Sequence, residues 1–237
     1  MINIRYIKRI IKKYLCDIGY ICTGQNIFYK VCNDIIQRIE FDYVVSIWCY
    51  RIYFDLIPFS AGKNIKEVCS DGVAYDLSIL TKEVGEDYPL NHSETLVANE
   101  IVSKIANFIL PFFDKCKDSI SAYCALCEVQ KEYKHTFNNI DSKFYDLGMY
   151  WLALDAGDYL TAKRVIEEFI EQNTDAFESN MQYFKSDSKF KQRLLERHEK
   201  QMNKWKGLLE ILKPENKKQL LELVEKNKAT TRQSFKL

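Results

Sequence analysis

Apolar and polar side chains alternate along residues 26–58, and this alternation constrains the fold more than any other feature of the sequence. One set of alternate positions is mostly apolar: Ile35, Gln37, Ile39, Phe41 and Tyr43, then Trp48, Tyr50, Ile52, Phe54 and Leu56. The positions between them are Ile36, Arg38, Glu40 and Asp42, then Cys49, Arg51, Tyr53 and Asp55. Successive side chains of a strand point to opposite faces of a sheet. The pattern therefore predicts strands at 27–31, 35–44 and 47–57, with one buried face and one polar face.

Helical periodicity replaces this alternation elsewhere in the chain. Residues 2–19 combine an apolar stripe with five cations, which predicts an amphipathic helix with a solvated basic face or, as the alternative, a phosphate-binding patch. Ser93 can cap a helix that runs to residue 113. The other predicted elements are a loop or short turn at 59–68, a fourth strand at 73–80, helices at 118–133 and 142–156, a polar loop at 173–187, a long helix beyond residue 190, a helix beginning at Pro214, and ten frayed residues at the end.

Together these elements predict an α+β fold, in which a small antiparallel sheet packs on helices and an α-helical C-terminal region follows. Gly157 can end one helix in a left-handed conformation and Asp158 can cap the next, so a helical hairpin is expected there. We expect an α+β domain over residues 1–114 and a helical region over residues 115–237 that packs on it or follows it.

The charge of the chain is balanced overall but unevenly distributed. The 237 residues include 34 Lys and Arg against 33 Asp and Glu, so no global field attracts a polyanion. The segment from Lys185 to Leu237 nevertheless contains 15 basic and 7 acidic residues. Such asymmetry indicates either a nucleic-acid surface or two parts of the molecule that attract each other or a partner.

The cysteines and the lengths of the apolar segments indicate the cellular compartment in which the protein is found. The eight cysteines would suit disulfides in a secreted protein, but the cations of residues 5–13 interrupt any signal-peptide core. No apolar run approaches the roughly 20 residues of a membrane span. We expect a cytoplasmic protein that does not bind membranes and whose cysteines are reduced and behave as small apolar side chains.

One set of side chains has a spacing that could suit zinc. Cys116, Cys124, Cys127 and His135 could supply four tetrahedral ligands. Cys124 and Cys127 lie three residues apart within a predicted helix, however, where the same spacing suits a buried stripe. We expect no metal, and these four residues are the candidate ligands if one is present.

Other common chemistries lack their motifs in this chain. The three histidines, His92, His135 and His198, do not lie near a cysteine in a known nucleophile context, and there is no Gly-x-Ser-x-Gly. The two common glycine-rich phosphate loops are also missing. The sequence therefore predicts no catalytic residues and no cofactor.

The polar face of the predicted sheet is the candidate binding surface. It consists of Arg38, Glu40, Arg51, Tyr53 and Asp55. Cross-strand ion pairs explain these residues without any function. Alternatively, the two arginines and Tyr53 line a groove for an acidic or peptide partner, or the carboxylates serve acid/base chemistry.

Several short motifs resemble a known family. They are the helix ending in Ile18-Gly19-Tyr20, then Asn26-Ile27-Phe28-Tyr29, Asp34-Ile35-Ile36-Gln37-Arg38-Ile39, Ile109-Leu110-Pro111-Phe112-Phe113 and Gly157-Asp158-Tyr159. Over residues 1–172 the chain resembles the bacterial family called domain of unknown function 4304, although Tyr20 and Cys22 stand where that family commonly has Phe and Lys. The resemblance implies an α+β fold in a bacterial cytoplasm and assigns no catalytic residues.

We therefore expect a non-enzymatic protein-binding module that recognises another protein through the sheet face or the helical hairpin, and that is able to form a homo-oligomer. An immunity or toxin-neutralising role is one form of this function, by analogy only. The alternatives are a hydrolase-type enzyme with a carboxylate/arginine cleft on the sheet and a nucleic-acid-associated protein. The latter would bind through the basic C-terminal helices.

Overall fold

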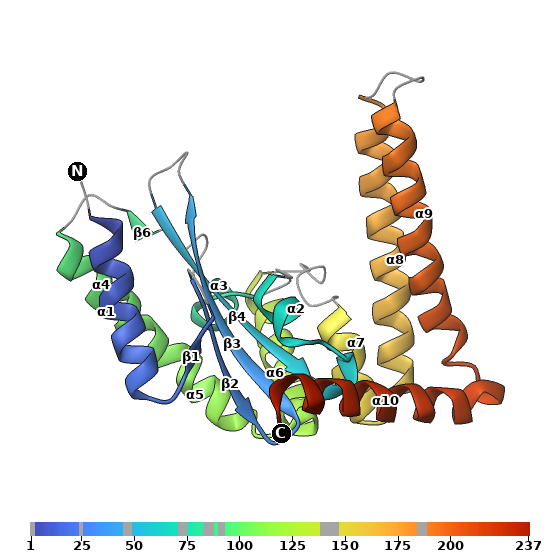
Figure 1. Ribbon diagram of the computed structural model, residues 1–237, viewed down its shortest axis with the longest axis horizontal. Helices are drawn as coiled ribbons and strands as arrows, with labels where there is room; N and C mark the ends of the chain where they lie inside the picture. Colours follow the sequence, from blue (N-terminus) through green and yellow to red (C-terminus); the bar gives the residue numbers. More distant parts are fainter. Residues whose placement is uncertain are drawn as a thin grey trace.

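The computed structural model describes residues 3–23, 26–44, 49–70, 75–82, 88–89, 93–137, 147–183 and 189–237. They form the expected α+β fold, in which an antiparallel sheet is covered by helices and followed by a helical C-terminal region (Figure 1).

The sheet has a simple meander topology. Its described strands are β1 (Ile21–Cys22), β2 (Ile27–Cys32), β3 (Ile35–Val44), β4 (Cys49–Pro58), β5 (Tyr75–Asp76) and β6 (Tyr88–Pro89), in the order β1-β2-β3-β4-β5 with β6 also paired to β4. The register places Arg38 opposite Asp55 and Asp42 opposite Arg51. The expected strands are thus confirmed where they are described, and Arg38 and Arg51 belong to the same face. Residues 47 and 48 of the third expected strand lie outside the described residues.

The apolar face of the sheet packs on N-terminal and central helices (Figure 1). In α1 (Ile4–Asp17), Ile7, Ile11 and Leu15 recur every four residues and are buried against this face. The second layer contains α4 (Glu94–Lys104), a π-helical turn (Ile105–Ile109) and α5 (Leu110–Lys115). The Ser93 hydroxyl caps α4 as expected, because it accepts a hydrogen bond from Leu96 N at 3.4 Å.

The continuous helical stretch Glu94–Lys115 corrects the expectation that no segment approaches a membrane span. It has 22 residues and includes an 18-residue window with a mean hydropathy of 1.4, which suffices for a span by length and composition alone. Its buried residues, which include Ile101, Ile105 and Ile109, pack in the same core as α1 and the sheet. The buried share of that window is 39%.

The C-terminal region begins with helices that extend the same core. They are α6 (Ser119–Phe137), α7 (Leu147–Asp155), α8 (Tyr159–Met181), α9 (Lys189–Glu210), η5 (Pro214–Asn216) and α10 (Lys217–Phe235). The main apolar cluster contains residues from both sides of the boundary expected at residue 114. Gly157 has φ +75° and separates α7 from α8, and the Asp158 carboxylate accepts a hydrogen bond from Thr161 N at 3.0 Å. The expected helical hairpin is therefore confirmed.

The helices α8 and α9, together called the arm, run side by side and project away from the sheet (Figure 1). Their shared seam contains Phe169 edge-on to Trp205 at 4.8 Å and Phe177 stacked on His198 at 3.7 Å. The helix α8 continues through residues 173–181, where a polar loop was expected. That expectation was wrong because packing against α9 stabilises a sequence of low intrinsic helix propensity.

The helix α10 crosses the base of the arm and packs on the second face of the sheet (Figure 1). Thr231 is buried and donates a hydrogen bond to Phe59 O at 3.1 Å, and the Phe235 ring packs edge-on to Tyr29 at 5.4 Å. The expectation of ten frayed terminal residues was therefore wrong, since α10 reaches Phe235.

Two shorter expectations also need correction. The fourth strand, expected at 73–80, is limited in the described residues to β5, and α3 (Ser78–Thr81) follows it. The expected loop at 59–68 contains η2 (Phe59–Ala61) and the beginning of α2 (Ile65–Ser70), with Gly62 at φ +67° between them. The Asp76 carboxylate accepts a hydrogen bond from Ser78 N at 2.8 Å, which favours a helical turn over a longer strand at this position.

Candidate functional site

Three of the five expected binding residues form one buried ionic cluster. Arg38 pairs with Glu40 on the same strand, and its Nη1 lies 3.6 Å from Asp55 Oδ2 on the neighbouring strand. Only 1% of the Arg38 side chain is exposed, against 25% of Glu40 and 8% of Asp55. The alternation in the sequence placed these residues on the polar face correctly. It could not show that this part of the face is covered.

Arg51 and Tyr53 lie on the same face beside this cluster, with Tyr53 directly opposite Glu40 and Arg51 opposite Asp42. Their side chains are half-buried, and Tyr53 forms a side-chain hydrogen bond with Arg51. Burial raises the pKa of Tyr53, and the bond and charge of Arg51 only partly offset the increase. The five expected residues therefore divide into a buried ionic cluster and a more accessible pair.

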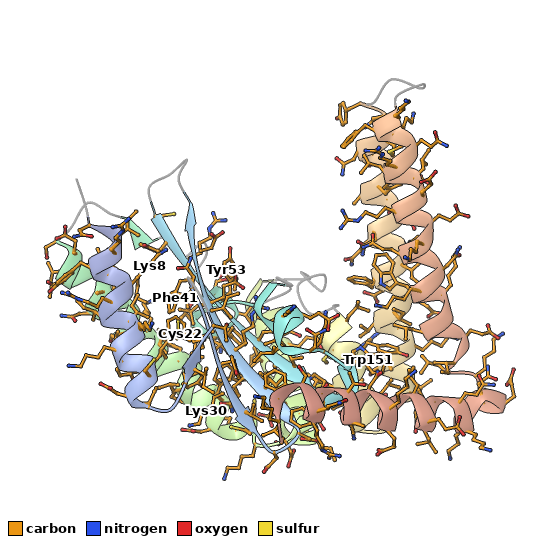
Figure 2. The ribbon with its side chains drawn as sticks, in the orientation of Figure 1. Lys8, Cys22, Lys30, Phe41, Tyr53 and Trp151 are labelled. Carbon is orange, nitrogen blue, oxygen red and sulfur yellow. The ribbon has the colours of Figure 1, made fainter. Side chains whose placement is uncertain are left out.

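A cleft of about 340 Å³ lies beside Asp55, where the sheet meets the helical region. It is lined by residues of β4, η2, α2, α7, α9 and α10, among them Trp151, which Figure 2 labels. Its charged lining residues are Asp55, Lys63, Glu67 and Lys204. Of the five expected site residues, the described lining includes Asp55 alone. The structure thus has a mixed-charge cleft next to the sheet face but does not bring the two arginines into it.

The sequence could not identify this cleft, because its walls come from segments separated by as many as 172 residues. No local pattern distinguishes Lys63 or Lys204 from other surface lysines. The only usable signal was a large aromatic residue, Trp151, in an otherwise ordinary apolar helix.

The cysteines proposed as metal ligands have different environments. The Cys116 thiol is buried and donates a hydrogen bond to Phe112 O at 3.3 Å, and burial raises its pKa to about 12. Cys124 is exposed and Cys127 is half-buried, while the side chain of His135 lies outside the described residues. Within the described part of the chain, no group of three or more His, Cys, Asp or Glu side chains could hold a metal ion.

The arm carries opposite charges on its two helices. The acidic residues of α8 are Glu167, Glu168, Glu171, Asp175 and Glu178, and the basic residues of α9 are Lys189, Lys191, Arg193, Arg197, Lys200, Lys204 and Lys206. The two helices lie side by side, and most of these charged side chains are exposed, so the positive charge of α9 is close to an acidic helix of the same molecule.

The free end of the arm, called the tip, exposes two aromatic side chains. Tyr183 is 80% exposed and Phe190 is 57% exposed, although large aromatic rings are normally buried to a great extent. Lys189 and Arg193 beside them are also exposed. The tip therefore presents two aromatic rings flanked by cations at the point of the arm farthest from the sheet (Figure 1).

No family model matches the chain, and comparisons with curated proteins and with solved structures find no significant match. The resemblance to the domain of unknown function 4304 family, with the bacterial origin that it implies, therefore stays a prediction.

Proposed function

We propose that this protein is a non-enzymatic protein-binding module that recognises its partner through the tip of the arm. The exposure of Tyr183 and Phe190 at the end of a projecting helical pair carries the proposal. Aromatic side chains and arginine are enriched among the residues that contribute most to protein–protein affinity.

The charges of the tip indicate the chemistry of the partner. The exposed Lys189 and Arg193 flank the two rings, so the complementary surface is an apolar pocket surrounded by acidic side chains. Two exposed rings supply less apolar area than membrane-surface helices bury, which favours a protein over a lipid surface. The acidic residues of α8 favour a protein over a nucleic acid, because they would repel phosphates close to the basic helix.

The buried ionic cluster is consistent with a non-enzymatic role. The guanidinium of Arg38 already contacts two carboxylates, and one oxygen of Asp55 accepts a hydrogen bond from Leu56 N at 2.8 Å. Groups held by such contacts stabilise the local structure and are poorly placed to bind a substrate.

The test is quantitative affinity capture from extracts of the native host with the full chain as bait. We expect one stoichiometric companion, captured at least about tenfold less by a variant with Tyr183→Ser and Phe190→Ser, because the loss of even one aromatic anchor costs about 2 kcal/mol or more and about 1.4 kcal/mol is tenfold in affinity. The matched control is Leu221→Ser on α10, which removes a side chain that is 52% exposed and lies away from the tip.

Equal capture by the tip variant would refute the proposal, as would recovery of the bait alone. Heparin chromatography of the same proteins addresses the nucleic-acid alternative. Salt-sensitive retention that is lost when the α9 cations are replaced by glutamine would support a nucleic-acid partner instead.

A further inference from the structure

A second cavity lies between α1 and the sheet, far from the tip of the arm. Its volume is about 270 Å³, slightly below the usual range of small-molecule sites, which begins near 300 Å³. Lys8 of α1, Cys22 of β1 and Phe41 of β3 line it, and Figure 2 shows these three residues close together in the space between the helix and the sheet.

The charged residues that line this α1 cavity, called its rim, are all cationic within the described part of the chain. Arg5, Lys8, Arg9 and Lys12 all line it, and no acidic residue does so within the described part of the chain. Their spacing of three, four and seven residues places them on one face of α1, beside the buried stripe. None of the four forms an ion pair with another described residue. Four like charges at one opening repel one another, and an anion placed there would relieve this repulsion.

The floor of the α1 cavity is apolar and rigid. Phe28 and Phe41 pack edge to face with ring centroids 5.9 Å apart, and Ile11 and Tyr50 complete the floor. All four side chains are at least 97% buried, so they belong to the core of the protein. A free inorganic anion would gain nothing from this surface, whereas an apolar group would lose unfavourable contact with water.

One polar atom of the α1 cavity is also unsatisfied. The buried Oδ1 of Asn26 has no hydrogen-bond partner among the described residues, although the great majority of buried polar atoms have one. The Asn26 amide lines the cavity, where it can accept a hydrogen bond from a ligand or, after rotation of its amide, donate one.

We propose that the α1 cavity binds a small anionic amphiphile, with its head group held by the cations of α1 and its apolar body resting on Phe28 and Phe41. The volume suits a free medium-chain carboxylate and is too small for a phospholipid with two acyl chains. This site is independent of the tip, so its test does not depend on the proposed protein partner.

The test is isothermal titration of the full chain with octanoate, with 1-octanol as the uncharged ligand of matching length. We expect octanoate to bind and to lose affinity as NaCl is raised, because salt screens the rim charges. We expect 1-octanol to bind about tenfold more weakly, since it lacks the charge that the cations recognise. Equal affinity for the two ligands would overturn the anionic part of the proposal, and no octanoate binding would overturn all of it.

Three variants locate the bound ligand. Lys8→Gln should weaken octanoate binding about tenfold, whereas Lys13→Gln should leave it unchanged, because Lys13 is an exposed cation of the same helix that does not line the cavity. Cys22→Leu should fill the cavity and abolish octanoate binding while the circular dichroism spectrum stays native. Equal losses in Lys8→Gln and Lys13→Gln would show attraction to the whole basic helix and refute a defined site.

Vesicles test whether the cations of α1 bind anionic lipid head groups at a membrane surface instead of a free carboxylate. The full chain is mixed with vesicles of phosphatidylglycerol and phosphatidylcholine and then centrifuged. We expect the protein to remain in the supernatant and octanoate to bind in the absence of vesicles. Sedimentation with vesicles that is lost in Lys8→Gln, without octanoate binding, would overturn the proposal in favour of a membrane surface.

Discussion

Asn227 of α10 occupies the space that a side chain on Gly62 would need. A Cβ atom at Gly62 would lie 2.8 Å from Asn227 Cγ, and the Asn227 amide donates a hydrogen bond to Ser60 O at 2.7 Å. The close approach of α10 to the sheet therefore depends on a glycine in the left-handed conformation.

The substitution Gly62→Ala tests this contact. We expect the free energy of unfolding to fall by about 2 to 4 kcal/mol, because alanine is strained at φ +67° and would displace Asn227. The control is Gly207→Ala in α9, where nothing lies within 4 Å of the new Cβ and stability should rise by up to about 1 kcal/mol. Urea denaturation measures both, and a neutral Gly62→Ala would contradict the predicted clash.

The substitution Arg38→Met tests the buried ionic cluster. Removing the guanidinium leaves Glu40 and Asp55 without their shared cation, which should cost about 3 to 5 kcal/mol of unfolding free energy. Arg51→Met, on the more accessible part of the same face, should cost about 1 kcal/mol or less. If thermal or urea unfolding gives equal losses for the two variants, the cluster is less shielded from water than the structure indicates.

The pH dependence of stability tests the cap of α8. Burial acts to raise the pKa of Asp158, but hydrogen bonds from Tyr123 Oη at 2.5 Å and Thr161 N at 3.0 Å outweigh it, so the pKa lies below its ordinary value of 3.8. Because the pKa of Asp158 is lower in the folded state, the ionised carboxylate stabilises the fold fully at pH values above its ordinary pKa. This stabilisation is lost as the pH falls through the folded value.

Asp158→Asn should therefore remove this part of the acid sensitivity while keeping most of the cap, because asparagine caps helices about as well as aspartate. Asp158→Ala should cost about 1 to 2 kcal/mol at neutral pH. The measurement is the unfolding free energy from pH 7 to below the ordinary carboxyl pKa. An unchanged acid profile in Asp158→Asn would show that other carboxylates account for the sensitivity.

Truncation tests whether α10 is an integral part of the fold. Ending the chain at Asn227 removes Thr231 and Phe235, which contact Phe59 and Tyr29. We expect a loss of about 3 kcal/mol or more, on the scale of removing one buried aromatic side chain. Deleting only residues 236–237, which are exposed, should change the melting temperature little. Similar melting temperatures for the two truncations would contradict the structure.

Local patterns were sufficient to predict the sheet and most helix positions. Alternation identified β3 and β4 because each strand has one face in the core, and a single register satisfies both strands. Capping residues such as Ser93 and Asp158 located helix starts, since they act on backbone groups only three residues away.

The predictions that were wrong or incomplete concern residues whose structure depends on packing against segments distant in the sequence. Residues 173–181 are polar, yet they are helical because Phe177 and its neighbours pack against α9. Arg38 looks like a surface residue in the sequence, but its side chain is 1% exposed and pairs with Asp55 of the neighbouring strand. The cations of the α1 cavity were visible as a basic helix face, but its apolar floor required the three-dimensional arrangement of α1 and β3.

The packing of α10 on the sheet has a consequence for biosynthesis. Residues 59 and 231 are hydrogen-bonded across 172 positions of sequence. During translation the N-terminal strands emerge long before the helix that shields their second surface. On this second face Phe235 of α10 packs on Tyr29, whereas Ile36, Phe59 and Val68 of the same cluster come from the N-terminal part of the chain. The apolar cluster on this face is therefore completed only when α10 has been synthesised.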